Sequence, residues 1–473
     1  MSVRRTSAVL TMVALLASIL SVAGVSNANA APPASAGQQP ALVRAAVAGQ
    51  PPANYVIPAT SFYSFPNRTK TEKGAIRNRV YSTIRSVWGG PKTPAGNARN
   101  GNGTIRMATW SFNDWGVARA LVNARERGVS VQIVGAKSAN TDFRPWKYLK
   151  RKLGHRLYQP GHPGTRDTVS FARECRGSCR GAGGTPHAKY FMFDNVGSRH
   201  VRNVVVQSSM NLTKFAVEGQ WNQAEVSWSK AVYAQFMGIF RQTRIGRAVS
   251  PTYRRSTAGS ITNIFFPLPR GRASNDPVMR ALNQTSCTRA TAGGNANRRT
   301  KIRIINYAIY GDRGTWIAKK LRNLWSRGCD IKILYAVSSR PVVSILRSAS
   351  GRGRIPMKQS VITNGRREIV KYNHSKWMTI TGRWGGSSGT YMTMSGSANW
   401  SAFAFTGDEQ IQQIRSRTQA IRHNSNFNKT WTQKSSHAPG FGTHASEARM
   451  LASIPVQPTF GKGIYKYLTP NGG

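Results

Sequence analysis

Two histidine–lysine pairs are the residues in this sequence whose types and spacing could do chemistry together. Each pair reads His-x-Lys, and each is followed about twenty residues later by a Ser-x-Asn segment. Random placement of the His and Lys residues would give about 0.36 His-x-Lys pairs. The repeated pattern consists of His187, Lys189, Ser209 and Asn211 in the first copy, and His374, Lys376, Ser397 and Asn399 in the second.

The spacing within each copy predicts a compact cluster. Residues i and i+2 of a strand point to the same face of a sheet. Each copy therefore offers an imidazole, an ammonium and an amide side by side, and two copies packed together would surround one anionic group. Lysine and asparagine can hold the non-bridging oxygens of a phosphodiester. One histidine can attack phosphorus while the other protonates the leaving oxygen. A lone histidine is more often structural, but the matched pattern argues against that interpretation here.

The elements around these residues repeat as well. Apolar residues predict a strand at 105–107, a helix over 117–124 and a strand over 129–133, and the same series recurs near 305, over 317–324 and over 329–333. Gly128 and Gly328 are the expected helix stops. Such βαβ units imply parallel strand pairs. We therefore expect an α/β protein of two pseudo-symmetric halves, each a mixed β-sheet flanked by helices, with the active site at the interface between the halves.

The two halves differ in length before the first histidine. The strand–helix–strand units lie 200 positions apart, whereas the histidines lie 187 apart, so the first half carries an insertion upstream of His187. Cys175 and Cys179 lie in this insertion, and we expect them to form a disulfide beside the site, with Cys287–Cys329 as the second bridge. A zinc site built on Cys175 and Cys179 is the alternative, but no further ligands stand nearby.

The charge of the chain is strongly positive. Lys and Arg number 68 against 16 Asp and Glu, which gives a net charge of +52. Ample Trp, Tyr and Phe argue against intrinsic disorder. Such a charge fits an anionic partner: phospholipid headgroups, nucleic acid or an anionic cell-wall polymer. With so few acids, a carboxylate-bound metal is disfavoured, and we expect no cofactor. Genome composition is an alternative contributor to the arginine content.

The N-terminus is typical of an exported protein. Arg4 and Arg5 precede a small, apolar stretch, and Ala28-Asn29-Ala30 fits a cleavage site. We predict a signal peptide at 1–30, cleaved near Ala30, and secretion of the mature protein. A Pro- and Ala-rich flexible leader should follow at 31–55, then an N-terminal half at 56–258 and a C-terminal half at 259–473. The polar, Gly-rich segment 271–300 is expected to be a loop. No later run is long enough to span a bilayer.

The motif resembles the duplicated HxKxxxxD motif of the phospholipase D superfamily. His187, Lys189 and Asp194 match its first copy, and His374 and Lys376 match its second. The resemblance covers about 100–410 and implies a pseudo-dimeric α/β fold and metal-independent phosphodiester hydrolysis through a covalent phosphohistidine. It also implies that His187 is the nucleophile and His374 the general acid for the leaving alcohol, then the base for water.

The resemblance also implies an acidic residue that orients each histidine. Glu225 and Glu409 occupy suitable positions, with Asp408 as the rival of Glu409. Thr381 departs from the motif, because it stands where the second Asp is expected. Asp194 and Thr381 both lie seven residues after their histidine, an odd offset, so on a regular strand they should face away from the chemistry and act in a turn or a supporting contact.

The motif is compatible with more than one class of substrate. The full duplication favours a secreted phospholipase D, a monomer acting on phospholipids at an anionic membrane surface. The alternative is a secreted metal-independent nuclease acting on DNA or RNA, which the charge fits equally well. A basic binding protein with a dead site is disfavoured because both pairs are intact. Five tryptophans near the predicted strands are candidates for lipid contact or for the core: Trp110, Trp221, Trp377, Trp384 and Trp400.

Overall fold

The computed structural model describes residues 55, 57–90, 102–157, 167–364 and 369–439. The predicted signal peptide (1–30) and all but the last residue of the predicted leader (31–55) lie outside these ranges, so both stay predictions. Among the described residues, no helix has the length and apolar composition needed to cross a membrane.

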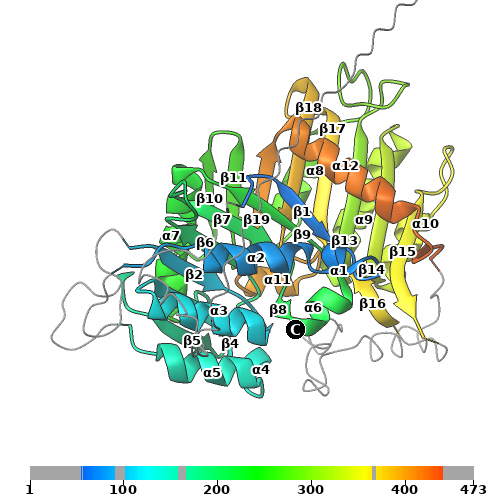
Figure 1. Ribbon diagram of the computed structural model, residues 1–473. Coiled ribbons are helices and arrows are strands. Elements are labelled where there is room, and N and C mark those ends of the chain that lie inside the picture. The colour runs from blue at the N-terminus through cyan, green and yellow to red at the C-terminus, as the bar shows by residue number, and fades with distance from the viewer. Residues whose placement is uncertain (1–54, 56, 91–101, 158–166, 365–368, 440–473) are drawn as a thin grey trace, which may run out of the picture. The chain divides into compact units, whose positions relative to one another are not determined.

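The first half is built on a mixed sheet (Figure 1). Its first three strands pair in parallel and the others antiparallel. The order across the sheet is β5 (Phe171–Cys175), β4 (Ser130–Ala136), β2 (Thr104–Ala108), β6 (Tyr190–Asp194), β7 (Val204–Ser208), β9 (Gln220–Ser227) and β1 (Ser61–Ser64). A separate short pair joins β3 (Phe112–Asn113) to β8 (Leu212–Thr213) in parallel.

The second half repeats this arrangement. Its parallel strands β15, β14 and β13 are followed by antiparallel strands, as in the first sheet. The order is β15 (Met357–Thr363), β14 (Asp330–Ser338), β13 (Lys301–Ile309), β17 (Lys376–Trp384), β18 (Ser387–Gly396), β19 (Gln410–Arg415), β11 (Ile261–Phe265) and β10 (Arg254–Ala258). The short strands β12 (Thr285–Ser286) and β20 (Ser436–His437) pair with β17 and β15.

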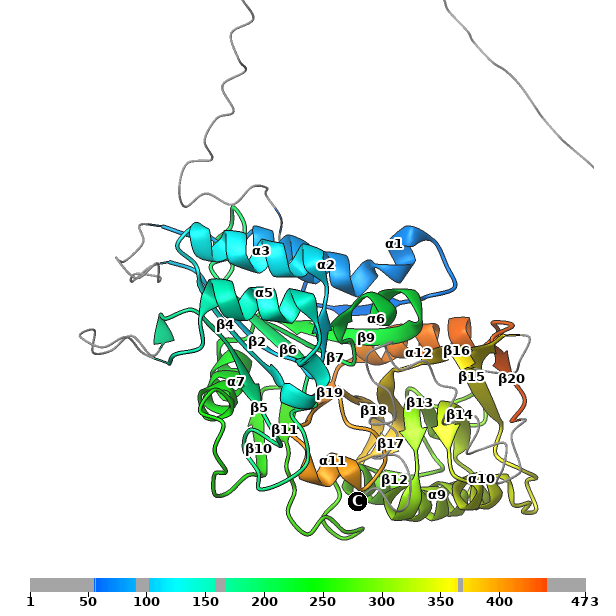
Figure 2. The same ribbon diagram turned by 90° about the horizontal axis from the view of Figure 1, so that it is seen from below.

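Helices cover both sheets. In the first half, α2 (Ala75–Arg85), α3 (Trp115–Glu126) and α5 (Arg144–Leu153) pack their apolar side chains on one face, and α7 (Lys230–Thr243) packs on the other (Figure 2). In the second half, α8 (Pro277–Asn283), α9 (Gly311–Ser326) and α10 (Arg340–Arg347) share one core, and α12 (Arg417–Trp431) contributes Phe427 to another. The short helices are α1 (Lys70–Lys73), α4 (Lys137–Asn140), α6 (Lys214–Glu218) and α11 (Phe403–Thr406).

The predicted βαβ repeat and its helix stops are confirmed. The units are β2–α3–β4 and β13–α9–β14, and in each the two strands are parallel neighbours. Gly128 and Gly328 follow the helix ends with φ of 86° and 97°, a left-handed conformation that glycine adopts without strain. Asp114 begins α3 by accepting a hydrogen bond from the main-chain N of Val117 at 2.9 Å.

One detail differs from the sequence expectation. The predicted loop 271–300 contains α8 and β12: Asp276 caps the helix through the main-chain N of Val278 at 2.9 Å, and Pro277 follows in its first turn. The division of the halves between Ala258 and Gly259 stays a prediction, and it falls in the turn between β10 and β11.

The halves are joined by strand pairing and by their strand ends. The strand β16 (Ile369–Asn373) pairs with β15 of its own half and, in parallel, with β9 of the first half. The two expected disulfides are present, Cys175–Cys179 and Cys287–Cys329. This pairing brings the segments before β6 and β17, which carry the two His-Lys pairs, to the interface between the halves.

Candidate active site

The first histidine is held by two residues of the second half. His187 lies just before β6, and its main-chain N donates to the carbonyl of Asp408 at 2.9 Å. Its ring Nδ1 donates to Oε1 of Glu409 at 2.7 Å. Ser397 donates its hydroxyl to the other oxygen of Glu409, so the carboxylate is fixed from both sides. The ring is therefore oriented, and its Nε2 is left for a ligand.

The second histidine is held in the same way by the first half. His374 lies between β16 and β17, and its main-chain N donates to the carbonyl of Trp221 at 2.9 Å. Its Nδ1 donates to Oδ1 of Asn222 at 3.1 Å. Ser209 donates its hydroxyl to the same oxygen at 2.8 Å. The two halves thus exchange the groups that orient their histidines, but one orienting group is a carboxylate and the other an amide.

The lysines are buried beside the histidines. Lys189 and Lys376 each donate from Nζ to the carbonyl of the histidine two residues earlier, the second at 2.6 Å. The Nζ of Lys189 also lies 5.7 Å from the ring centre of Trp110, and that of Lys376 lies 5.0 Å from the ring centre of Tyr307. The aromatic ring face is an attractive surface for an ammonium that has lost most of its water.

Two glutamines tie the lysine strands across the interface. The amide Nε2 of Gln223 donates to the carbonyl of Gly396 at 2.9 Å, and its Oε1 accepts from the main-chain N of Lys376 at 3.2 Å. In the opposite direction, Nε2 of Gln410 donates to the carbonyl of Lys189 at 3.0 Å. These bonds set the two His-Lys segments in a common register.

The electrostatics of the cluster follow from burial of several cations around one carboxylate. Burial lowers the pKa of His187 to about 4, although Glu409 raises it, and lowers the pKa of Lys189 to about 7. The pKa values of His374 and Lys376 are lowered well below their usual range by burial, reinforced by the neighbouring lysines. Burial raises the pKa of Glu409, but the nearby His187 and Lys189 outweigh this and lower it.

The charge of the cluster fits an anion. The empty cluster carries less positive charge than its four basic groups could hold, because burial lowers the pKa of each of them. An anion bound there would favour the protonated form of every basic group in the cluster. The site is therefore electrostatically prepared for a phosphodiester.

The predicted asparagines also lie at the interface, on the segments that follow β7 and β18. The carboxamide oxygens of Asn211 and Asn399 are buried with no hydrogen-bond partner among the described residues. The main-chain carbonyl of Asn399 accepts from Nη1 of Arg313 at 2.8 Å, and Arg313 forms a fully buried ion pair with Asp276. The two carboxamide oxygens thus have no partner within the described residues, while the backbone of Asn399 is fixed.

One predicted site residue is misplaced in the sequence interpretation. Glu225 contacts neither His187 nor His374. It accepts from the hydroxyl of Ser61 at 2.6 Å and lies 3.0 Å from Nε2 of the buried His423. It faces the strand β1 and the helix α12, because its position on β9 is three residues beyond Asn222, an odd offset that turns it to the other face of the sheet. Asn222 takes the orienting role that was assigned to Glu225.

The other candidate residues lie as follows. Asp194 accepts from the main-chain N of Asn203 at 3.1 Å and pairs with Arg202 at 2.8 Å, in the turn after β6. Thr381 donates to the carbonyl of Gly293 at 2.8 Å. Both face away from the cluster, as their odd offset predicts. Asp408 does not contact a histidine ring.

The tryptophans divide between core and site. Four of the five are buried in the structure: Trp221, Trp377, Trp384 and Trp400. Trp110 is the member next to the cluster, with its ring centre 5.4 Å from that of His187.

Sequence reasoning missed Asn222, Gln223 and Gln410. A signal for them was present, because Asn222-Gln223 and Glu409-Gln410 are separated by 187 positions, the same offset as the two histidines. Asn222 and Glu409 occupy equivalent positions, but one is an amide and the other a carboxylate. A search for acidic residues therefore does not find this part of the repeat. In the described part of the chain, no three His, Cys, Asp or Glu side chains gather where they could hold a metal ion.

Two mixed sheets that meet at a buried pair of His-Lys segments define a pseudo-twofold α/β protein with one cluster of basic groups at its interface. The family model described as "Cardiolipin synthase, PLD-like domain" matches residues 97–244 and 295–431, more than half of the chain. The chain belongs to this family, and hence to the phospholipase D superfamily of enzymes that process phosphodiester bonds. The comparison with curated protein sequences returned no match.

Solved structures with a similar fold come from several kinds of enzyme. Polyphosphate kinase from Porphyromonas gingivalis is 11% identical, with a TM-score of 0.48 over 82% of this chain and 54% of that one, so the chain spans about half of the kinase. Phosphatidylserine synthase from Haemophilus influenzae Rd KW20 is 11% identical over 80% and 87% of the chains, with a TM-score of 0.45. The phospholipase D family member Nuc from Salmonella typhimurium is 18% identical over 38% and 98%, with a TM-score of 0.26.

Proposed function

We propose that this protein is a secreted phosphodiesterase of the phospholipase D type, which hydrolyses phospholipids to phosphatidic acid and a free headgroup alcohol. The observation that carries the proposal is the exchange of orienting groups between the halves: Glu409 holds His187 and Asn222 holds His374, both through Nδ1. Each imidazole is therefore left with Nε2 for chemistry, one for attack and one for proton transfer.

In the first step, Nε2 of His187 attacks the phosphorus atom. A bond forms between Nε2 and phosphorus, and the bond from phosphorus to the headgroup oxygen breaks. That oxygen takes the Nε2 proton of His374, which acts as the imidazolium because the bound anionic substrate favours its protonated form. The carboxylate of Glu409 stabilises the positive charge that develops on the His187 ring as it becomes a phosphohistidine. The headgroup alcohol then leaves.

In the second step, the neutral His374 takes a proton from water as the water oxygen attacks phosphorus. The bond from phosphorus to Nε2 of His187 breaks, which releases phosphatidic acid and restores both histidines. An alcohol in place of water would give a new phosphodiester by the same route, so the acceptor decides between hydrolysis and transfer.

Lys189, Lys376, Asn211 and Asn399 supply the oxyanion contacts of both steps. Buried ammonium and amide donors stabilise charge on the non-bridging oxygens without reorganising water. Asp194 and Thr381 would support the fold around the motif, since neither faces the cluster.

A phospholipid is the substrate that the combined observations favour. The complete duplicated site lies in one chain, and the matching family model carries the description of a lipid synthase. The signal peptide predicted at 1–30 and the two disulfides are consistent with an exported protein that meets lipid surfaces outside the cell. The second candidate is a secreted nuclease of the same superfamily, and the observation that favours it is the net charge of +52.

A direct comparison of substrates tests the proposal. The purified protein is assayed with EDTA on phosphatidylcholine vesicles that contain an anionic lipid, and in parallel on single- and double-stranded DNA. We expect phosphatidic acid from the vesicles and intact DNA, and added ethanol should yield phosphatidylethanol if alcohols enter the second step. Cleaved DNA with unchanged lipid would replace the phospholipase by the nuclease. Complete loss of turnover in EDTA would overturn the lysine-based mechanism.

A further inference from the structure

The disulfide-closed loop of residues 175–179 contacts a buried carboxylate of the second half. Ser178 donates its hydroxyl to Oδ1 of Asp408 at 2.9 Å, and the main-chain N of Cys179 donates to Oδ2 at 2.5 Å. Both oxygens of Asp408 are thus bound by residues of one short loop, which the Cys175–Cys179 bridge closes.

The main chain of Asp408 is joined to the segment that carries His187. The main-chain N of Asp408 donates to the carbonyl of Thr185 at 2.9 Å, and its carbonyl accepts from the main-chain N of His187 at 2.9 Å. The next residue, Glu409, binds the His187 ring. Asp408 therefore holds the backbone of His187, and Glu409 holds its ring. The loop of residues 175–179 in turn holds the side chain of Asp408.

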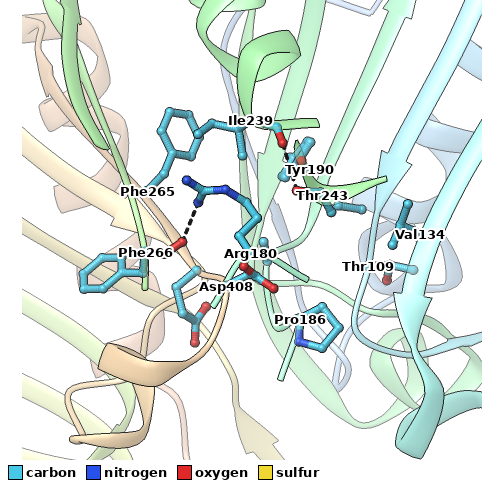
Figure 3. Close-up of a pocket in the computed structure, with 13 residues that line it drawn as sticks. Thr109, Val134, Arg180, Pro186, Tyr190, Ile239, Thr243, Phe265, Phe266 and Asp408 are labelled. Carbon is cyan, nitrogen blue, oxygen red and sulfur yellow. Dashed lines mark hydrogen bonds between the residues drawn. The ribbon is translucent and has the colours of Figure 1, made fainter. Parts of the chain in front are cut away.

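The loop is anchored independently of Asp408. The hydroxyl oxygen of Ser178 accepts from the main-chain N of Gly181 at 2.7 Å. Arg180 is buried, and its guanidinium donates to the carbonyl of Phe266 at 2.7 Å (Figure 3). It also donates to the carbonyl of Thr252 at 2.6 Å. These bonds fix the position of the loop, and the loop can therefore fix the Asp408 carboxylate.

Packing does not replace these hydrogen bonds. A small cavity lies beside Asp408 and Glu409, lined on its other sides by side chains such as Thr109, Val134 and Ile239 (Figure 3). Atoms that border a cavity lose dispersion contacts on that side. The position of Asp408 and Glu409 next to His187 therefore depends on their polar contacts more than on van der Waals packing.

Within the described ranges, no disulfide-closed loop holds the second histidine in this way. The residue equivalent to Asp408, 187 positions earlier, is Trp221, whose carbonyl accepts from the main-chain N of His374. Its ring is buried, and Nε1 donates to Gln433 at 3.2 Å. A large buried ring fixes that side by packing, so the loop of residues 175–179 serves the His187 side of the site alone.

We propose that Asp408 is a positioning residue for His187, and that the loop closed by Cys175–Cys179 is the clamp that holds it in place. This inference rests on the proposed function in one respect only, that His187 is the group whose placement limits turnover. A displacement of a reacting group by about 1 Å can lower a rate by about a hundredfold. Loss of the clamp should therefore lower kcat and leave binding of the substrate nearly unchanged.

The test compares the two disulfides. The double variant Cys175→Ser/Cys179→Ser removes the clamp's bridge, and Cys287→Ser/Cys329→Ser removes the other bridge, whose residues contact neither histidine. We expect kcat of the first variant to fall at least about tenfold with KM within about twofold of the wild type. The second variant should keep kcat and lose more thermal stability, because its bridge closes a loop of sequence separation 42 instead of 4.

Ser178 and Asp408 supply milder variants. Ser178→Ala removes one bond to the carboxylate and should lower kcat, whereas Ser178→Thr keeps the hydroxyl and should restore most of it. Asp408→Asn keeps the size of the side chain but leaves it one acceptor oxygen for two donors, the hydroxyl of Ser178 and the main-chain N of Cys179, so one of the two bonds is lost and kcat should fall.

A spectroscopic readout separates this inference from the proposed function. The Nδ1 proton of His187, hydrogen-bonded to Glu409, should give a downfield proton resonance that is absent in His187→Ala. We expect this resonance to shift or broaden in Cys175→Ser/Cys179→Ser and to stay unchanged in Cys287→Ser/Cys329→Ser, whatever substrate the enzyme turns over. An unchanged resonance and an unchanged kcat in the folded Cys175→Ser/Cys179→Ser protein would overturn the clamp. A changed resonance in a protein without phosphodiesterase activity would keep the clamp and remove the proposed function.

Discussion

The two histidines are chemically unequal although their surroundings are related by a repeat. A carboxylate that accepts from Nδ1 stabilises positive charge on the ring, whereas an amide oxygen does so only weakly. His187 has the carboxylate of Glu409, and His374 has the amide of Asn222. A nucleophile becomes positively charged when it forms a bond to phosphorus, and an acid must release its proton readily. The partners therefore favour His187 as the nucleophile and His374 as the acid.

Trapping of the covalent intermediate tests these roles. His187→Ala should abolish turnover and any phosphoenzyme. His374→Ala lacks the acid, but a nitrophenyl phosphodiester has a leaving group that needs little protonation, so the adduct should still form. It should accumulate because the base for water is also missing. The measurement is acid-labile phosphate on His187, located by mass spectrometry of the His374→Ala protein.

The opposite labelling pattern would contradict the assignment. An adduct on His374 in the His187→Ala protein would reverse the two roles. If neither variant nor the wild type gave any phosphohistidine, the two-step mechanism would be wrong for this protein.

Glu409 and Glu225 can be compared as a test of the residue that orients His187. Both glutamates are buried: Glu409 directly precedes β19 and binds His187, whereas Glu225 lies in β9 and binds Ser61 and His423. Glu409→Gln should lower kcat by about 10²- to 10⁴-fold, because the ring loses the charge that stabilises its cationic state. Glu225→Gln should keep kcat and lower the unfolding free energy instead. Steady-state kinetics and chemical denaturation of both variants distinguish these effects, and equal losses of kcat would refute the assignment.

The depressed pKa of Lys189 predicts a pH-dependent affinity for anions. Burial lowers this pKa to about 7, so the free protein loses the ammonium charge as the pH rises above that value. Tungstate, a phosphate mimic whose charge is constant between about pH 6 and 9, should bind less tightly with rising pH and take up protons on binding. Calorimetry in two buffers of different ionisation enthalpy measures this uptake. A flat affinity without proton uptake would show that Lys189 keeps its proton in the free protein.

The lowered pKa of Lys189 affects folding stability in the direction opposite to anion affinity: stability should rise with pH where affinity falls. Between the folded pKa and the usual pKa of lysine, the unfolded chain binds more protons than the folded one. The contribution of Lys189 to the free energy of unfolding of the empty protein should therefore rise with pH through this window.

Most of the site could be predicted at the residue scale, and the part that failed has a physical cause. His187, Lys189, His374 and Lys376 follow from spacing, because i and i+2 share a strand face, whereas Glu409 followed from the resemblance to the phospholipase D motif, with Asp408 as its rival. The partner of His374 could not be found by looking for an acid, since an amide takes that place. Which half supplies each partner is a tertiary property, because the bonds cross between segments far apart in sequence.

At the scale of elements, periodicity predicted the βαβ units but not every short helix. The helices α3 and α9 bury one apolar face each, so their 3.6-residue pattern is visible. The helix α8 is only seven residues long and lies in a polar segment, where composition suggested a loop. Asp276-Pro277 was a local start signal for it, and this signal outweighs composition because a cap and a first-turn proline act on the backbone directly.

The two helix-terminating glycines give an element-scale prediction. Alanine at either position would take up the left-handed conformation, at about 1–2 kcal/mol. A Cβ at Gly128 would also lie 2.2 Å from the main-chain oxygen of Gly90, whereas at Gly328 its nearest neighbour is the end of the Arg299 side chain at 2.6 Å. Gly128→Ala should therefore destabilise the protein more than Gly328→Ala in denaturant unfolding. Equal losses would mean that the segment around Gly90 moves away without cost.

At the scale of the whole molecule, the site exists only where both halves meet. Gln223 reaches from the first half to the Lys376 strand, and Gln410 reaches from the second half to the Lys189 strand. The orienting residues cross in the same two directions. Neither half supplies the residue that orients its own histidine. Because both halves belong to one chain, the half that carries Glu409 is always paired with the half that carries Asn222.

The net charge of +52 is a property of the whole chain, and it predicts a salt dependence that separates binding from chemistry. Surface lysines and arginines attract an anionic surface at long range and release its counterions, so binding to phosphatidylglycerol vesicles or DNA should weaken steeply between about 50 and 200 mM salt. The ammonium groups of Lys189 and Lys376 are buried, and interactions between buried groups are screened much less. Turnover of a small soluble phosphodiester should therefore change little over the same range.

Vesicle co-sedimentation and nitrophenyl phosphodiester kinetics, measured on one preparation at each salt concentration, check both expectations. Vesicle binding that is constant across the range would show that the surface charge does not bring the protein to its substrate, and a parallel loss of turnover would show that the cluster is open to salt.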